Sequence, residues 1–321
     1  MVQIYFTTKV PKNKTGLYKQ SPCDHKELYL KYVEKGAYNT ILISGYKYCQ
    51  KTMHSLKQLF KKYAPAALIR TYRQRPLLEP GKFKFLVIGA GRGGTSLLAC
   101  LLDTHPDIEV GFEKNANAIL GGESFTESSK HNLSNERIHC FYRSCIGDSR
   151  LSRKKIYGNK ITTEQISFLE NHSSPSPNLR IQVLKHFFEQ YFACIKIVFI
   201  LRDGRTCVRS KLARTNQTME EACAKWKYSV EMYRFLSGKT NVLCIKYEDL
   251  VSNPETTLST VCSFLGTTYH PIMLSGTMND KMPLMYKQKK INTSPVTLDK
   301  ISKTIEPFLR LELLELGYLS E

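Results

Sequence analysis

The chain has 321 residues, 42% of them apolar and 23% charged, which is enough for one large domain or two small ones. Its net charge of +19 favours polyanionic partners such as sulfated sugars, acidic peptides or phosphate cofactors. The basic residues are spread along the chain without an RNA-binding signature, zinc-finger spacing or basic zipper, so we expect no nucleic-acid partner.

Signals for the cellular compartment conflict. The sequence has no apolar signal-peptide region at its N-terminus and no run of about 18 apolar residues that could span a membrane. The ten cysteines contain no CxxC pair, so we expect no metal site, and disulfides would require an oxidising compartment. N-x-S/T sequons, which favour a glycoprotein of the secretory pathway, occur at Asn13, Asn132, Asn171, Asn216 and Asn292.

In chain order, residues 1–80 are a basic, tyrosine-rich extension to which the sequence assigns no role. Within it, "TILISGY" at 40–46 predicts a short strand and residues 51–64 an amphipathic helix. Residues 81–321 alternate strands with helices, which predicts one α/β domain with a mostly parallel sheet flanked by helices. Residues 121–155 are polar, and we expect them to be a surface excursion.

Three apolar runs predict the buried strands, at 83–88, 195–201 and within "NVLCIKYEDL". Helices are predicted after each of them, one through Leu102, one beginning at a capping box of Thr218 with Glu221, and one ending at Gly266. Ligands of such sheets bind beyond the carboxyl ends of the strands, where two turns rich in glycine and arginine fall.

The first turn, "GAGRGGTS" at 89–96, is suited to hold an anion. Its glycines bring amide N–H groups close to a ligand, and the helix that begins near Thr95 directs its positive end there. Ser96 adds a hydroxyl donor and Arg92 a fixed charge. The lysine of a nucleotide-hydrolysing P-loop is missing. A dinucleotide-binding GxGxxG turn and a purely structural glycine turn are the alternatives.

The second turn, "RDGR" at 202–205, follows the strand at 195–201. Ser210 and Arg214 are four residues apart on the predicted helix and therefore share a face. Together with Arg202 they could bind one phosphate. The alternative is a surface charge cluster around Asp203.

Together the two turns resemble the sulfotransferases that use 3′-phosphoadenosine 5′-phosphosulfate, in particular the tyrosylprotein sulfotransferases. The resemblance covers roughly residues 83–318 and rests on "GRGGTSLLACLLDTHPDIEVGFE", "LRDGRTCVRSKLAR", "KYEDLVSNPETTLSTVCSFLG" and "ELGY". It implies a P-loop-like fold, transfer of a sulfuryl group to an acceptor hydroxyl, and no cofactor metal.

The resemblance also implies a role for each matching residue. The 5′-phosphosulfate would be held by Arg92, Gly93, Gly94, Thr95 and Ser96. The 3′-phosphate would be held by Arg202, Ser210 and Arg214, and Tyr247 would contact the nucleotide. Glu113 falls at the place of the catalytic base, and Lys160 at that of a lysine that assists the departing phosphate, as Arg92 also would.

The chemistry of sulfuryl transfer agrees with these roles. The acceptor oxygen loses its proton as it attacks sulfur in line, so a carboxylate near the first turn can serve as general base. Negative charge grows on the bridging oxygen of the leaving phosphate, where Lys160 and Arg92 can stabilise it. Without the resemblance, Glu113 reads as an ordinary surface carboxylate at the end of a strand.

The chain departs from the family at several places. Asn115 stands where the family has an arginine linked to acceptor recognition, and Val110 and Gly158 stand where it has two cysteines. A basic stretch near the C-terminus is represented only by Lys287, Lys289 and Lys290. Sulfuryl transfer is therefore better supported by the sequence than a tyrosine acceptor.

The resemblance implies a protein or peptide acceptor with a tyrosine near acidic residues, a location in the Golgi lumen or secretory pathway, and allows a homodimer. A carbohydrate acceptor, as in glycosaminoglycan-type enzymes, is the nearest alternative. A nucleotide kinase-like P-loop enzyme and a catalytically silent anion-binding module are the others.

Overall fold

A computed structural model describes the chain at residues 3–6, 28–34, 37–43, 79–122, 134–170, 177–282, 284, 287, 291 and 298–320. The chain divides into two compact units, residues 1–71 and residues 72–321. Of the five sequons, only that at Asn216 lies within the described residues.

The first unit contains a small antiparallel sheet. Its strands are adjacent in the order β1 (Gln3–Phe6), β2 (Leu28–Glu34) and β3 (Ala37–Ile43). The strand predicted at 40–46 is confirmed over residues 40–43. The helix predicted at 51–64 lies outside the described residues.

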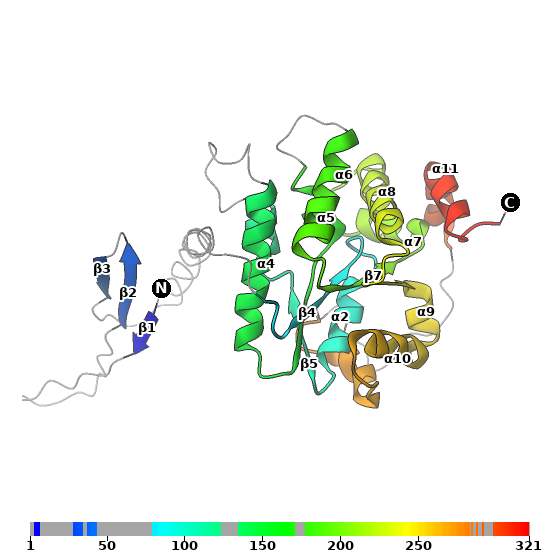
Figure 1. Ribbon diagram of the computed structural model, residues 1–321. Coiled ribbons are helices and arrows are strands. Elements are labelled where there is room, and N and C mark those ends of the chain that lie inside the picture. Colours follow the sequence, from blue (N-terminus) through cyan, green and yellow to red (C-terminus); the bar gives the residue numbers. More distant parts are fainter. Residues whose placement is uncertain are drawn as a thin grey trace, which may run out of the picture. The chain divides into compact units, whose positions relative to one another are not determined.

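The second unit is built on a five-stranded parallel sheet with the strand order β5-β6-β4-β7-β8 (Figure 1). All four pairs of neighbouring strands are parallel, and β4 is the central strand. This confirms the predicted mostly parallel sheet flanked by helices. The strands are β4 (Phe83–Ile88), β5 (Ile108–Phe112), β6 (Ile156–Lys160), β7 (Lys196–Leu201) and β8 (Val242–Lys246).

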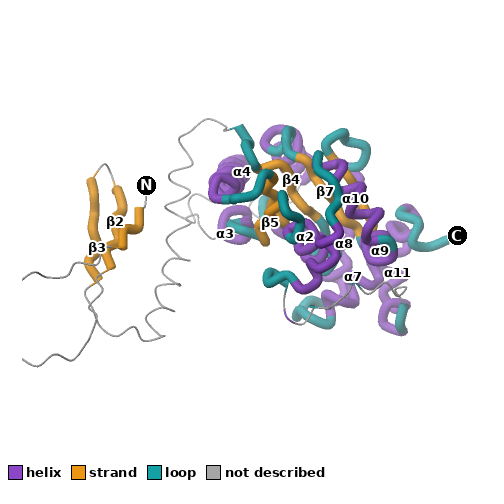
Figure 2. Tube along the Cα trace, turned by 90° about the horizontal axis from the view of Figure 1, so that it is seen from below, coloured by secondary structure: helices purple, strands orange, loops and turns teal. Residues whose placement is uncertain are grey.

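Helices pack against the sheet along its length (Figures 1 and 2). On one face, side chains of α2 and α10 share an apolar cluster with Phe85, Val87 and Val198 of the central strands. Burial of such apolar surface contributes about 25 cal/mol per Å² to folding, so this cluster holds the strands and their turns in place. The helices are α2 (Thr95–Asp103), α3 (Ala116–Leu120), α4 (Ser134–Leu151), α5 (Thr163–Ser167), α6 (Pro177–Lys185), the π-helix η2 (His186–Tyr191), α7 (Gly204–Leu212), α8 (Met219–Leu236), α9 (Tyr247–Ser252), α10 (Pro254–Leu265), the 3-10 segment η3 (Pro271–Met278) and α11 (Lys300–Glu315).

The surface excursion expected at 121–155 is wrong over much of its length, because α4 packs into the protein. Ile138 and Phe141 of this helix are buried, and so is Arg137. The Arg137 guanidinium donates to the carbonyl of Leu120 (2.8 Å). Burial lowers the pKa of Arg137 to about 10, and the guanidinium is still charged at neutral pH. A buried arginine bonded to carbonyl groups reads as a surface residue in sequence.

Gly158 in β6 lies opposite Phe85 in β4, and the Phe85 ring fills the space beside it. A Cβ atom at residue 158 would lie well inside van der Waals contact with the ring carbons. Because Phe85 is fully buried, the ring has no free space into which it could move. A cysteine at this place, as in the resembling family, therefore requires a different neighbour on β4.

We predict that Gly158→Ala destabilises the protein by roughly 1–3 kcal/mol, the usual cost of overpacking a core. Denaturant unfolding measures the change. Combining Gly158→Ala with Phe85→Leu should cost less than the sum of the two single changes, because the smaller side chain makes room. Strict additivity would contradict this account of the contact.

Candidate functional site

The first turn connects β4 to α2 and is held closed by a hydrogen bond from Gly93 N to the carbonyl of Ala90 (2.8 Å). Gly94 precedes α2 in the left-handed conformation, with φ 97°. A Cβ atom there would overlap the ring of Tyr247, so the turn needs glycine for conformation and for space. Arg92 also has a positive φ, 71°, which is costly for a residue with a side chain.

The second turn follows β7 and lies against the first. The Arg202 guanidinium donates from Nη1 to the carbonyl of Arg92 (3.0 Å) and from Nε to Thr206 Oγ1 (2.9 Å). Arg92 in turn donates from Nε to Ser210 Oγ (3.2 Å). The two turns, far apart in sequence, thus meet at a single point of the sheet edge.

Tyr247 closes the same corner from the end of β8. The Arg202 guanidinium lies 4.3 Å above the centre of its ring, in a cation–π contact. The backbone of Arg202 is held by α8, because Trp226 Nε1 donates to its carbonyl (3.0 Å). The sequence contains a single tryptophan, so this side chain is a natural fluorescent reporter of the corner.

A charge cluster does form around Asp203, but it is buried instead of lying on the surface as the alternative expected, and its arginine is Arg205 and not Arg202. Asp203 caps α7 by accepting from Arg205 N (2.9 Å), and the Arg205 guanidinium binds Asp203 Oδ2 (2.7 Å). Arg205 also reaches Glu306 Oε2 (2.8 Å) and the carbonyl of Tyr318 (2.9 Å). This buried network attaches α11 to the second turn and uses Arg205 for structure.

Arg214 is not on the helix that carries Ser210. The sequence pattern places both on one helical face, but α7 ends at Leu212 and Arg214 follows in an exposed turn. Hydrogen bonds from Ala213 N to the carbonyl of Arg209 (3.0 Å) and from Thr215 N to the carbonyl of Lys211 (2.9 Å) continue the helical pattern past Leu212, so Ser210 and Arg214 remain about one helical turn apart.

Glu113 and Lys160 form an ion pair at the ends of β5 and β6. The Lys160 side chain is 6% exposed and that of Glu113 is 33% exposed, so the carboxylate is the accessible partner. Gln165 Nε2 donates to Glu113 Oε2 (3.0 Å) and to Asn117 Oδ1 (2.7 Å). Glu113 also has a positive φ, 51°, and so the backbone aims this carboxylate at some cost.

Asn115 occupies the place where the resembling family has an arginine. Its φ of 61° lies in the left-handed region, which asparagine tolerates better than most residues. Its Nδ2 donates to Ser144 Oγ (2.6 Å) of α4, so the side chain is turned into the protein.

Glu164 and Lys211, which the sequence did not single out, support the first turn, Glu164 by direct contact and Lys211 through Glu164. Glu164, on α5, accepts a hydrogen bond from Gly91 N at both carboxylate oxygens (3.1 and 2.9 Å). It is ion-paired with Lys211 of α7, whose side chain is only 3% exposed. Burial alone would raise the pKa of Glu164, but the Lys211 charge and the hydrogen bonds from Lys211 and Gly91 outweigh it and hold this pKa below its usual range.

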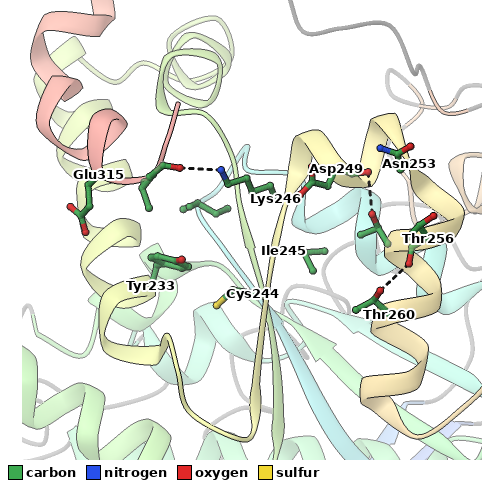
Figure 3. Close-up of a pocket in the computed structure, with 12 residues that line it drawn as sticks. Tyr233, Cys244, Ile245, Lys246, Asp249, Asn253, Thr256, Thr260 and Glu315 are labelled. Carbon is green, nitrogen blue, oxygen red and sulfur yellow. Dashed lines mark hydrogen bonds between the residues drawn. The ribbon is translucent and has the colours of Figure 1, made fainter. Parts of the chain in front are cut away.

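A groove of about 970 Å³ lies beside β8, at the end of the sheet (Figure 3). Its described lining includes Lys246, whose Nζ donates to the carbonyl of Leu316 (3.0 Å), together with the carboxylates of Asp249 and Glu315. This mixture of charges is unsuited to a polyanion, and the residues of the two turns do not line the groove. We therefore place the candidate site at the two turns.

The described residues contain no group of three or more side chains that could hold a metal ion. None of the described helices combines the length and the apolar character that crossing a bilayer requires. The described part of the site brings two guanidinium groups, a carboxylate and a lysine to one sheet edge.

Comparison with known proteins agrees with this class of site. The model of the sulfotransferase family matches residues 85–271, and the chain belongs to that family. The resemblance drawn from the two turns is thereby confirmed.

Curated relatives in the family are protein-tyrosine sulfotransferases. The chain is 24% identical over 254 residues to the protein-tyrosine sulfotransferase of Drosophila melanogaster, covering 73% of this chain and 48% of that protein. It is 22% identical to protein-tyrosine sulfotransferase 2 of Gallus gallus, covering 68% of this chain and 62% of that protein. The chain spans about half the length of the curated relatives it matches.

Among solved structures, the sulfotransferase domain of the Synechococcus PCC 7002 olefin synthase matches with a TM-score of 0.46 and 19% identity, covering 74% of this chain and 98% of that chain. The sulfotransferase domain from the curacin biosynthetic pathway matches with a TM-score of 0.43 and 17% identity, covering 71% of this chain and 97% of that chain.

The lowered pKa of Glu164 predicts an acid-dependent contribution to stability. Because the pKa is lower in the folded chain, the stabilisation is present above the usual glutamate pKa of 4.5 and is lost as the pH falls through the lowered value. We expect Glu164→Gln to cost roughly 3–5 kcal/mol at pH 7, since it leaves Lys211 without its charge partner.

The difference in unfolding free energy between wild type and Glu164→Gln should begin to narrow below about pH 4.5, where the carboxyl group of the unfolded chain takes up a proton. It should be smallest below the lowered pKa of Glu164, where the carboxyl group of the folded wild type is protonated as well. Urea unfolding at pH 7 and at progressively lower pH measures it. A difference independent of pH would show that the carboxylate charge has no part in the effect.

Proposed function

We propose that the chain transfers the sulfuryl group of 3′-phosphoadenosine 5′-phosphosulfate to an acceptor hydroxyl, and that the acceptor is a protein tyrosine. The observation that carries the proposal is the junction of the two turns, where Arg202 bonds the carbonyl of Arg92 and Arg92 bonds Ser210. A ligand with phosphate groups at both ends would find a guanidinium group for each. The relatives named protein-tyrosine sulfotransferases support the choice of acceptor.

The side chains at the edge suit such a nucleotide. The 5′-phosphosulfate would lie against the first turn, beside Gly93, with Arg92, the backbone N–H of Gly94 and the hydroxyl groups of Thr95 and Ser96 as donors. The 3′-phosphate would be bound by Arg202 and Ser210, with Arg214 able to approach from its exposed turn, and Tyr247 would contact the nucleotide. By the same resemblance we assign the reaction to the Golgi lumen or the secretory pathway.

In this proposal Glu113 is the general base. It accepts the proton of the acceptor hydroxyl as that oxygen forms its bond to sulfur. The bond between sulfur and the bridging oxygen breaks, and Lys160 and Arg92 stabilise the charge that develops on this oxygen. The Glu113–Lys160 ion pair supports the assignment, because it brings the base and the cation to one point of the edge. Gln165 orients the base through its bond to Oε2.

Transfer of labelled sulfate tests the proposal. The substrates are an acidic peptide with one tyrosine, the same peptide with phenylalanine in its place, and a small set of glycans. We expect label only on the tyrosine peptide. Label on a glycan would assign a carbohydrate acceptor, and the absence of any transfer together with stabilisation by ATP and Mg²⁺ would favour the kinase-like alternative.

Glu113→Ala should lower the transfer rate by at least about 100-fold, which is the lower range for loss of a general base. The affinity for adenosine 3′,5′-bisphosphate should stay within a few-fold of wild type, because Glu113 is assigned no contact with it. Calorimetry measures the affinity and labelled sulfate the rate. The control is Glu109→Ala, which should retain the rate, because Glu109 is a carboxylate within β5, the strand that Glu113 follows, and is bonded to Ser152. Loss of bisphosphate binding in Glu113→Ala would show that the base is misassigned.

Arg202→Ala should weaken adenosine 3′,5′-bisphosphate by about 10- to 100-fold, the loss of a charge-assisted hydrogen bond. Adenosine 5′-phosphosulfate, which lacks the 3′-phosphate, should be affected far less. Arg209→Ala is the matched control, because Arg209 lies on the adjacent α7 and pairs with the surface residue Asp299. Equal weakening of both nucleotides by Arg202→Ala would count against the 3′-phosphate assignment.

A further inference from the structure

The short helix α5 connects the parts of the site that the two turns leave separate. It begins just after Lys160 and is fixed at its start by a capping box of Thr162 and Gln165. Thr163 N also donates to the carbonyl of Gly89 (3.0 Å), which attaches the helix to the first turn. Two neighbouring residues then point to different groups, Gln165 to the Glu113 carboxylate and Glu164 to the amide of Gly91.

Both peptide units that flank the Gly91 Cα atom are held by hydrogen bonds. Its N–H donates to both carboxylate oxygens of Glu164. Its carbonyl lies 3.5 Å from Cys207 Sγ, which burial keeps as a protonated donor by raising its pKa to about 11. Cys207 and Lys211, the charge partner of Glu164, both belong to α7, one helical turn apart.

The Glu164–Lys211 ion pair lies close to residues that are assigned to the nucleotide. Lys211 directly follows Ser210, the residue that accepts from Arg92. The Glu164–Lys211 ion pair therefore lies between the turn assigned to the 5′-phosphosulfate and the helix assigned to the 3′-phosphate. The Gly91 N–H and the Ala90 carbonyl belong to one planar peptide unit, so a bond that fixes the N–H also fixes the direction of the carbonyl. That carbonyl accepts the hydrogen bond from Gly93 N that closes the turn.

Anion binding by backbone groups depends on donors that are oriented before the ligand arrives. A buried ion pair suits this task, because removing one partner leaves the other charge uncompensated and the arrangement is thus hard to distort. Glycine at residue 91 fits as well, since a Cβ atom there would lie only 3.1 Å from Glu164 Oε1.

We propose that Glu164 and Lys211 are positioning residues that preset the first turn for the 5′ end of the nucleotide and hold it in register with α7. The inference rests on the proposed function. Neither side chain is assigned a contact with the reacting groups. Loss of Glu164 should weaken recognition of the 5′ end and leave recognition of the 3′-phosphate intact.

The Gly91 amide can be observed alone. The dipeptide Ala-Gly occurs once in the sequence, at 90–91, so labelling alanine with ¹³C at the carbonyl and glycine with ¹⁵N gives one signal for this peptide. In Glu164→Ala we expect the Gly91 proton to exchange with solvent about tenfold faster than in wild type, because its acceptor is gone. Glu170→Ala is the control. The Glu170 side chain is 15% exposed, close to the 17% of Glu164, and it is paired with Arg180. In this variant the exchange rate of the Gly91 proton should be unchanged.

Nucleotide binding gives the second readout. Glu164→Ala should weaken adenosine 3′,5′-bisphosphate by about tenfold. Adenosine 3′-monophosphate, which lacks the 5′ group, should bind within about twofold of wild type, since a change of that size is below 0.5 kcal/mol. Melting temperatures of all variants separate a change in affinity from a change in folding. If Glu164→Ala does not fold, the neutral pair Glu164→Gln with Lys211→Met takes its place, with the same expected selectivity.

The outcomes are separable. Gly91 exchange as slow in Glu164→Ala as in wild type, or an equal loss of affinity for both nucleotides, overturns the positioning role. If the wild type binds neither nucleotide, the proposed function fails, and the exchange rates alone decide whether Glu164 fixes the turn.

Discussion

The parallel register around β4 is the constraint on which the site depends. β4 pairs with β6 on one side and β7 on the other, with Val87 opposite Lys160 and Ile88 opposite Phe199. β5 extends the pattern, since Phe112 lies opposite Lys160 and Glu113 N donates to the Lys160 carbonyl (2.7 Å). Because parallel strands all end at the same edge of the sheet, this register brings the two turns, the Glu113 carboxylate and the Lys160 ammonium group together at that edge. The apolar cluster beneath the sheet keeps the register in place.

Backbone strain is concentrated at the same edge. The described non-glycine residues with positive φ are Arg92, Glu113 and Asn115, and each belongs to a turn at the carboxyl end of β4 or β5. Such conformations cost about 1–3 kcal/mol each and persist only where surrounding contacts fix them. Here the contacts are hydrogen bonds. Arg202 donates to the Arg92 carbonyl, Gln165 donates to the Glu113 carboxylate, and the Asn115 side-chain amide donates to Ser144. At Arg92 and Glu113 the strain is consistent with side chains positioned for a ligand, whereas the Asn115 side chain is bonded within the protein.

Much of this architecture could be predicted because its elements produce patterns among residues that are close in sequence. The apolar runs at 83–88 and 195–201, the glycine turn at 89–94 and the capping box of Thr218 each depend on residues near one another in sequence. Non-local contacts escaped prediction. Arg137 looks like a surface residue until the carbonyl of Leu120 is seen to bind it. Glu164 and Lys211 lie 47 residues apart, and no periodicity connects them. The helix end was also beyond the pattern, since α7 ends at Leu212 and Arg214 follows in the turn that continues it.

The two ends of the site differ in how far they follow the resembling family. At the nucleotide end, the matching arginines meet as the proposed ligand requires. At the proposed acceptor end, Asn115 is uncharged and is bonded to Ser144, and the neighbouring Lys114 is paired with Asp148 (2.8 Å). An acidic peptide would therefore have to bind basic residues elsewhere on the chain, whose net charge is +19. The acceptor specificity of this chain therefore cannot rest on the arginine that the family uses there, even where the sulfuryl chemistry is the same.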